Sequence, residues 1–215
     1  MKAKSRTVRS NPMRRLILSH TRPRKCRICS ARLKRQYPDQ NHRVDLWARR
    51  FINTKEETNA LDALTAMTLA VKSEFSYTVR VMEGCQSPVE TLTRKTGSCR
   101  DFALLMMEAV RALGLAARFV SGYLWTPFGG DRRPGRRPAR RNACLGQVYL
   151  PGAGWVEFDP TSGLAGNRNL IRIAVVRDPS QAVPISGKWT GAPADFLRME
   201  VDVRVRAHDR PLLNG

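Results

Sequence analysis

The sequence predicts an α+β fold in which N-terminal helices pack on an antiparallel β-sheet. Segments with helical spacing of apolar residues occupy the first half of the chain, and short alternating segments separated by turn sequences occupy the second half. The 215 residues are enough for one domain with a sizeable core, and 42% of them are apolar, as in ordinary globular proteins.

Four helices are predicted, and the last of them is the clearest. The first covers about 44–52, the second runs from its N-cap Asn59 to about residue 75, and a short third begins with Pro88. The fourth ends at Gly114. Its apolar residues recur at i, i+3, i+4, i+7, i+8 and i+11: Phe102, Leu105, Met106, Ala109, Val110 and Leu113. This spacing predicts a helix with one buried face.

Strands are predicted after the helices, because apolar residues there alternate or form short runs between turn sequences. The predicted strands are 117–125, 147–150, 155–158, 170–176 and 199–205. A Pro-Gly-Ala-Gly turn joins the second and third into a hairpin. The residues between the first two, about 126–146, are rich in Arg, Pro and Gly and are expected to form an irregular loop.

The net charge of +20 is concentrated in two segments. Residues 1–50 carry 16 Lys and Arg against 2 acidic residues, and 131–141 carry six Arg and one Asp. The rest of the chain is almost neutral. We therefore predict a basic, disordered segment over 1–43, a folded core over 44–207 and a flexible C-terminus over 208–215.

Composition also predicts the class of protein. No uninterrupted apolar run approaches the roughly 18 residues of a membrane span, and no apolar region follows the basic N-terminus as in a secretory signal. Five cysteines without regular spacing do not suggest a disulfide framework. A cytoplasmic protein without membrane contact is the expectation.

Two residues suggest chemistry on local grounds. Cys99 begins the clearest helix, where the dipole and free N–H groups stabilise a thiolate and could receive an oxyanion. The alternative is a small buried residue at a helix start. Asp159 ends a predicted strand before Pro160, where its carboxylate could orient a neighbouring base or could serve only the turn.

Three motifs together resemble bacterial transglutaminase-like proteins. They read GSCRDFA from Gly97, RALGLAARFVSGYL from Arg111 and VYLPGAGWVEFDPT from Val148. The resemblance covers about 45–206 and implies a papain-like cysteine protease fold with a Cys–His–Asp triad. It assigns Cys99 as the nucleophile and Asp159 as the acid that orients the histidine. It also implies thiol acyl transfer, or hydrolysis of peptide or protein amides, through a thioester on cysteine, with no metal or organic cofactor.

The histidine of such a triad is missing. In the family it lies in a His-Ala-Trp context before the Val-Tyr-Leu-Pro-Gly strand, a position that falls here on Asn142 or Ala143. Neither side chain accepts a proton at neutral pH. The three histidines, His20, His42 and His208, lie outside the span between Cys99 and Asp159. The sequence therefore predicts an impaired or inactive enzyme, since a thiol needs a nearby base.

A frameshift is one hypothesis for the loss. Codons that encode Arg-Asn-Ala-Cys-Leu-Gly at 141–146 can, read one base later, encode Thr-His-Ala-Trp, so about 129–146 could be read out of frame. Gene sequencing tests it, and codons that cannot give His-Ala-Trp would refute it. Family members also usually carry a larger β-rich domain where this chain has its basic segment, which suggests a truncated copy.

Other functions are predicted less strongly. The basic N-terminal segment could bind nucleic acid or another anionic surface, but it has few aromatic residues and no recognisable DNA-binding motif. Cys26 and Cys29 resemble half of a zinc ribbon without a second pair. Neither a metal ion nor nucleic acid is therefore expected as a partner. Arg100 and Asp101 could support the thiol of Cys99 or could be solvated charges at the helix start. The sequence does not specify the substrate or the oligomeric state.

Overall fold

The computed structural model describes residues 30–53, 57–79, 84–124, 141–166, 170–183, 190–192 and 195. Its helices are α1 (Ser30–Leu33), α2 (Arg43–Arg49), α3 (Ala60–Glu74), α4 (Pro88–Arg94), α5 (Cys99–Ala112) and a 3-10 turn at Pro179–Ala182. Its strands are β1 (Ser76–Tyr77), β2 (Thr96–Gly97), β3 (Ala117–Leu124), β4 (Arg141–Leu150), β5 (Gly154–Asp159), β6 (Leu164–Ala165) and β7 (Leu170–Val176).

The predicted α+β architecture is confirmed. Five strands form an antiparallel sheet in the order β6-β5-β4-β3-β7. The short strands β1 and β2 form a separate parallel pair just before α5. In the centre of the sheet, β3 and β4 pair without interruption, and Ser121 lies opposite Cys144.

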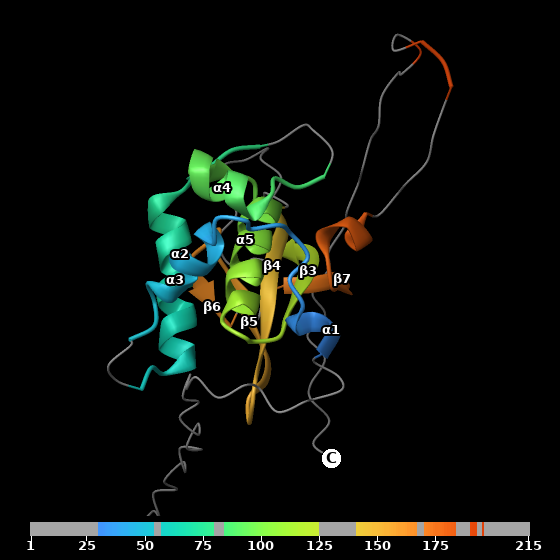
Figure 1. The fold of residues 1–215 in the computed structure, drawn as a ribbon. Helices are drawn as coiled ribbons and strands as arrows, with labels where there is room; N and C mark the ends of the chain where they lie inside the picture. The colour runs from blue at the N-terminus through green and yellow to red at the C-terminus, as the bar shows by residue number, and fades with distance from the viewer. Residues whose placement is uncertain are drawn as a thin grey trace, which may run out of the picture.

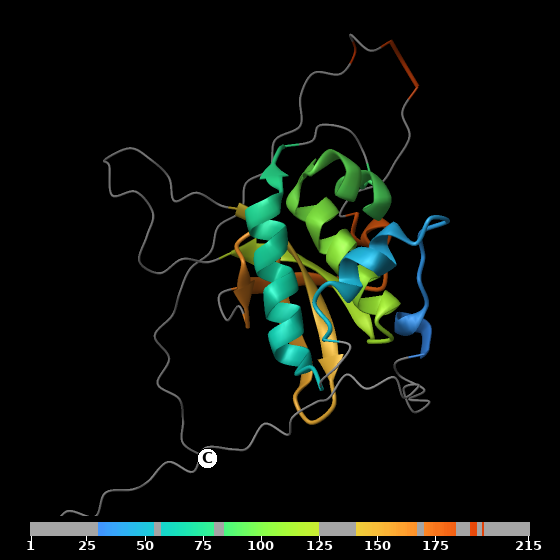
Figure 2. The ribbon, with the colours of Figure 1, turned by 60° about the vertical axis from the view of Figure 1, so that its left-hand side comes forward.

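Helix α5 lies against β3 and β4, while α2, α3 and α4 pack around it (Figure 1). The view in Figure 2 shows α3 running alongside α5. Gly114 adopts a φ of 79°, a left-handed conformation that ends the helix as predicted. The arrangement therefore makes α5 the central element of the domain.

Burial of α5 is more complete than its amphipathic pattern predicts. Every residue from Asp101 to Arg111 is buried, so the expectation of one buried face is wrong. The sheet covers one side of the helix and other segments cover the rest. The two charged residues far from its N-terminus, Glu108 and Arg111, are fully buried and form a 2.7 Å ion pair, which makes this burial tolerable.

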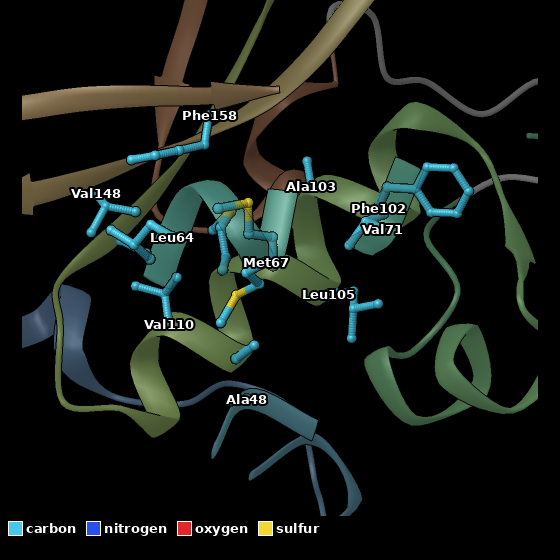
Figure 3. Close-up of a cluster of buried hydrophobic side chains, with 14 of the residues drawn as sticks. Ala48, Leu64, Met67, Val71, Phe102, Ala103, Leu105, Val110, Val148 and Phe158 are labelled. Carbon is cyan, nitrogen blue, oxygen red and sulfur yellow. The ribbon is translucent and has the colours of Figure 1, made fainter. Parts of the chain in front are cut away.

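The main core lies between α5, α3 and the sheet (Figure 3). Leu64 and Met67 of α3 are fully buried and face Val110 of α5 and two sheet residues, Val148 and Phe158. At the other end of α5, Phe102 makes an edge-on contact with Phe75, with ring centroids 5.8 Å apart. These contacts fix the position of α5 relative to the sheet.

Packing on the core begins before residue 44, where the predicted boundary lay. The backbone N–H groups of Gln36 and Tyr37 donate to the Glu108 carboxylate, and Arg111 Nε donates to the carbonyl of Arg32 at 3.1 Å. A buried carboxylate needs such donors, and a reading based on apolar spacing does not detect them. The 30–42 segment is therefore part of the folded unit.

Strand β4 also begins earlier than expected. The sequence predicts an irregular loop over 126–146, but residues 141–146 pair one by one with residues 119–124 of β3. Cys144 and Gly146 lie on the side of β4 that faces α5, and a Cβ atom at Gly146 would lie 3.5 Å from Met107. The remaining loop residues, the first 29 residues, the strand predicted at 199–205 and the C-terminal segment lie outside the described residues.

Gly122 provides a test of the sheet geometry. A Cβ atom added there would lie 2.1 Å from the Ile171 carbonyl oxygen of β7, beside the register shift between β3 and β7. We expect Gly122→Ala to lower the free energy of unfolding by about 1–3 kcal/mol in urea titrations, the usual cost of overpacking.

The matched control is Gly146→Ala, because a Cβ atom there makes an ordinary 3.5 Å contact with Met107. Its effect should stay below about 1 kcal/mol in either direction. Equal effects of the two substitutions would contradict the close approach of β3 and β7.

Candidate functional site

The first turn of α5 holds Cys99 in a fixed position. Ser98 is the N-cap, and its N–H and its hydroxyl both donate to the Asp101 carboxylate at 2.8 Å. The other carboxylate oxygen accepts a 2.6 Å hydrogen bond from the N–H of Gln86. The loop before α4 and the start of α5 are thus joined through one side chain.

Asp101 is therefore not a solvated charge at a helix start. Its side chain is buried, and its position in the first turn also suits the positive end of the helix dipole. The structure assigns it a positioning role for the turn that carries Cys99. Sequence reasoning left this role open beside the alternative of a solvated charge.

Strand β4 brings a second thiol to Cys99. The Cys144 thiol hydrogen-bonds to the Cys99 sulfur, and both residues lie against the same apolar core. Cys144 is buried, whereas Cys99 is partly exposed. No motif in the sequence marks Cys144 as functional. The alternation of Cys144 with Gly146 and Val148 predicts that all three face the same side of β4. The sequence does not predict which residue on that side lies beside Cys99.

The two thiols differ in acidity because of this contact. The hydrogen bond from Cys144 lowers the pKa of Cys99, with help from backbone N–H groups of Cys144 and Arg100 and the charge of Arg100, while burial opposes the shift. The hydrogen bond to Cys99 raises the pKa of Cys144, and burial and the Cys99 charge add to this increase. Of the two thiols, Cys99 is therefore the one that ionises first.

Ala143, one of the two positions that match the family histidine, lies on the other side of β4 from Cys144. Side chains alternate along a strand, so Ala143 faces away from α5 when Cys144 faces it. Ala143 is buried but lies outside the core cluster that contains Cys144. The backbone of Asn142 pairs with Tyr123. Of the described residues of β4, Cys144 is the one that meets the Cys99 sulfur.

Asp159 is the last residue of β5, on the strand beside β4. It is 2% exposed, and its Oδ1 accepts hydrogen bonds from the N–H groups of Thr161 and Ser162 at 3.0 and 3.1 Å. This carboxylate therefore serves the turn, as one of the two sequence readings expected. Its role in orienting a base stays a prediction.

No described histidine stands at the thiol. His42 is exposed in the turn that caps α2, and the other two histidines lie outside the described residues. Among the described residues, no group of three His, Cys, Asp or Glu side chains could hold a metal ion. Cys26 and Cys29 fall outside that part of the chain. Nor does any described helix have the length and apolar character needed to cross a membrane.

The sequence profile of the transglutaminase-like superfamily matches residues 47–160. The chain belongs to this superfamily. The match includes both Cys99 and Asp159, which confirms the resemblance inferred from the three motifs.

Solved and curated relatives agree with this assignment. A crystal structure of a candidate cysteine protease from Cytophaga hutchinsonii is 27% identical with a TM-score of 0.55, and the match covers 70% of this chain and 47% of that one. An uncharacterized protein of Mycobacterium leprae is 27% identical over 167 residues, or 78% of this chain and 57% of the relative. One from Mycobacterium bovis is 30% identical over 147 residues, or 66% and 47%. The chain spans about half the length of the curated relatives it matches.

The thiol pair makes a pH-dependent prediction. The rate of iodoacetamide alkylation of Cys99 should reach half its maximum below the pH at which an ordinary cysteine does, because the lowered pKa keeps the thiolate at lower pH. In Cys144→Ala this midpoint should rise, since the largest lowering contribution is lost.

Cys144→Ser is the control, because a hydroxyl still donates a hydrogen bond and should keep much of the shift. The assay is alkylation across pH with the Cys99 peptide quantified by mass spectrometry. A midpoint that does not change in Cys144→Ala would contradict the contact.

Proposed function

We propose that this domain is a thiol acyl-transfer site in which Cys99 accepts acyl groups as a thioester but turns over amides poorly. The observation that carries the proposal is the Cys99 sulfur at the N-terminus of α5, facing a thiol on β4. The substrate class is the acyl group of a peptide or protein amide, as expected for the superfamily. Asp159 is proposed as the acid of the ancestral triad.

The first half of the reaction needs only groups that are present. The Cys99 thiolate attacks the acyl carbonyl carbon, and negative charge develops on the carbonyl oxygen. The N–H groups of the first turn of α5 are suitable donors to this oxygen, and the N–H of Arg100 already points to the sulfur. Collapse of the intermediate then forms the thioester and expels the leaving group.

The fate of the leaving group separates amides from activated esters. An amine must gain a proton as it leaves, whereas a phenolate leaves without one. Cys144 is a poor proton donor because its pKa is raised by Cys99 and by burial. Attack of water on the thioester needs a base that removes a proton from the water. We therefore propose that activated esters acylate Cys99 and that deacylation is slow.

An inactive fold is the competing proposal, and it has an observation in its favour: no described residue places an imidazole at the thiol. Loss of a triad base typically removes several orders of magnitude of rate. The two proposals differ in whether Cys99 still forms a thioester. Binding of nucleic acid by the basic N-terminal segment stays a prediction, because the first 29 residues lie outside the described part of the chain.

The test uses an aryl ester and a peptide amide with the full chain. With the ester, we expect a burst of phenol equal to the protein concentration, followed by slow turnover, and no burst in Cys99→Ala. With the amide, we expect no product above background. Phenol release that shows no burst and does not differ from that of Cys99→Ala would favour the inactive fold. Amide hydrolysis that depends on Cys99 would contradict the argument from the missing base.

Restoring an imidazole tests the site further. Cys144→His places the base on the helix-facing side of β4, and should speed deacylation on the order of 10²-fold, as a general base does. Ala143→His is the matched control, because its side chain faces the other way. Faster deacylation in Ala143→His alone would show that the catalytic base belongs at position 143 and that our choice of position is wrong.

A further inference from the structure

The contact between Cys99 and Cys144 has chemistry that acyl transfer does not use. Cys99 starts α5, Cys144 lies on β4 opposite Ser121, and a hydrogen bond joins their sulfur atoms. Both thiols are free. We propose that Cys99 and Cys144 form a thiol–disulfide exchange pair that reacts with low-molecular-weight disulfides and closes to an intramolecular disulfide.

The two cysteines have different access to solvent, and this assigns their roles. Cys99 is partly exposed and is the thiol whose pKa is lowered, so it is the one that attacks an external disulfide. Cys144 is 4% exposed and cannot meet a bulky disulfide directly. It can reach only the sulfur of Cys99, which it already contacts. Cys144 is therefore the resolving thiol.

The reaction balances in two steps. The Cys99 thiolate attacks one sulfur of R–S–S–R, forms a Cys99–S–R mixed disulfide and releases one thiolate RS⁻. Cys144 then loses its proton to solvent and its sulfur attacks Sγ of Cys99, which releases the second RS⁻. The external disulfide is reduced to two thiols, and the protein dithiol is oxidised to a disulfide. The sulfur atoms must approach from hydrogen-bond contact to about 2 Å for the bond to form.

The first step prepares the second. Two of the causes that raise the pKa of Cys144 are its hydrogen bond to Cys99 and the charge on Cys99. Both disappear when Cys99 becomes a neutral mixed disulfide, and Arg100 continues to favour the anion. Cys144 thus becomes a better nucleophile only after Cys99 has reacted. Burial still opposes its ionisation, which keeps Cys144 unreactive toward other reagents.

A metal site is a weaker interpretation of the same pair. Within the described part of the chain, no third ligand joins the two sulfurs, and sites for Zn²⁺ usually have at least three protein ligands. Exchange needs two thiols only. The consequence for the proposed acyl transfer is direct, because the disulfide consumes the Cys99 thiolate.

The experiment incubates the reduced full chain with mixtures of oxidised and reduced glutathione, traps free thiols with iodoacetamide and identifies the cysteine peptides by mass spectrometry. We expect the free thiols of Cys99 and Cys144 to disappear together and a linked Cys99–Cys144 peptide pair to form. Cys144→Ser should instead stop at a Cys99–glutathione adduct. Cys85 is the third cysteine of the described residues, and Cys85→Ser is the matched control, which should behave as the unaltered chain.

Accumulation of the Cys99–glutathione adduct in the unaltered chain, without the linked peptide pair, would overturn the proposal, as would pairing of Cys99 with Cys85. The unaltered chain gives this answer even if Cys144→Ser does not fold. The mass assay uses no acyl substrate, so a failed exchange and a failed ester burst are distinguishable results.

Discussion

The complete burial of α5 is the constraint on which the rest of the structure depends. A helix buried from Asp101 to Arg111 can be covered only if the sheet, three helices and the 30–42 segment all pack against it. The charged residues in this stretch are each compensated: Glu108 pairs with Arg111, and Asp101 accepts hydrogen bonds from Ser98 and Gln86. The same packing leaves Cys99 at the helix end, partly exposed and held against β4.

The alternation of side chains along β4 decides which of its residues face α5 and Cys99. Cys144 meets Cys99, whereas Ala143, the neighbouring residue and one of the two that match the family histidine, faces the other side. Gly146 lies opposite Phe158, so continuing the ladder places Leu145 opposite Asp159, on the side of Ala143. Changes of sequence that keep the chain length also keep the pairing register of β4, so the strand can form without the family histidine. The frameshift hypothesis has that property.

Sequence reasoning predicted the helices, the antiparallel sheet and the start of α5 at Cys99, because each depends on local spacing and caps. It did not predict three features that depend on contacts between distant segments. The carboxylate of Glu108 recruits the 30–42 segment, the 141–146 residues join β3 despite their loop-like composition, and Cys144 faces Cys99. Periodicity reports which residues are buried, but it does not report which partner each of them meets.

The thiol pair is tested most directly by titrating the ultraviolet absorbance of thiolate in the full chain and in Cys99→Ala. We expect a first ionisation at lower pH than that of an ordinary cysteine, and we expect Cys99→Ala to remove it, because the pKa of Cys99 is lowered and that of Cys144 is raised. Titration of all the thiols at ordinary cysteine values, unchanged by Cys99→Ala except in amplitude, would contradict it.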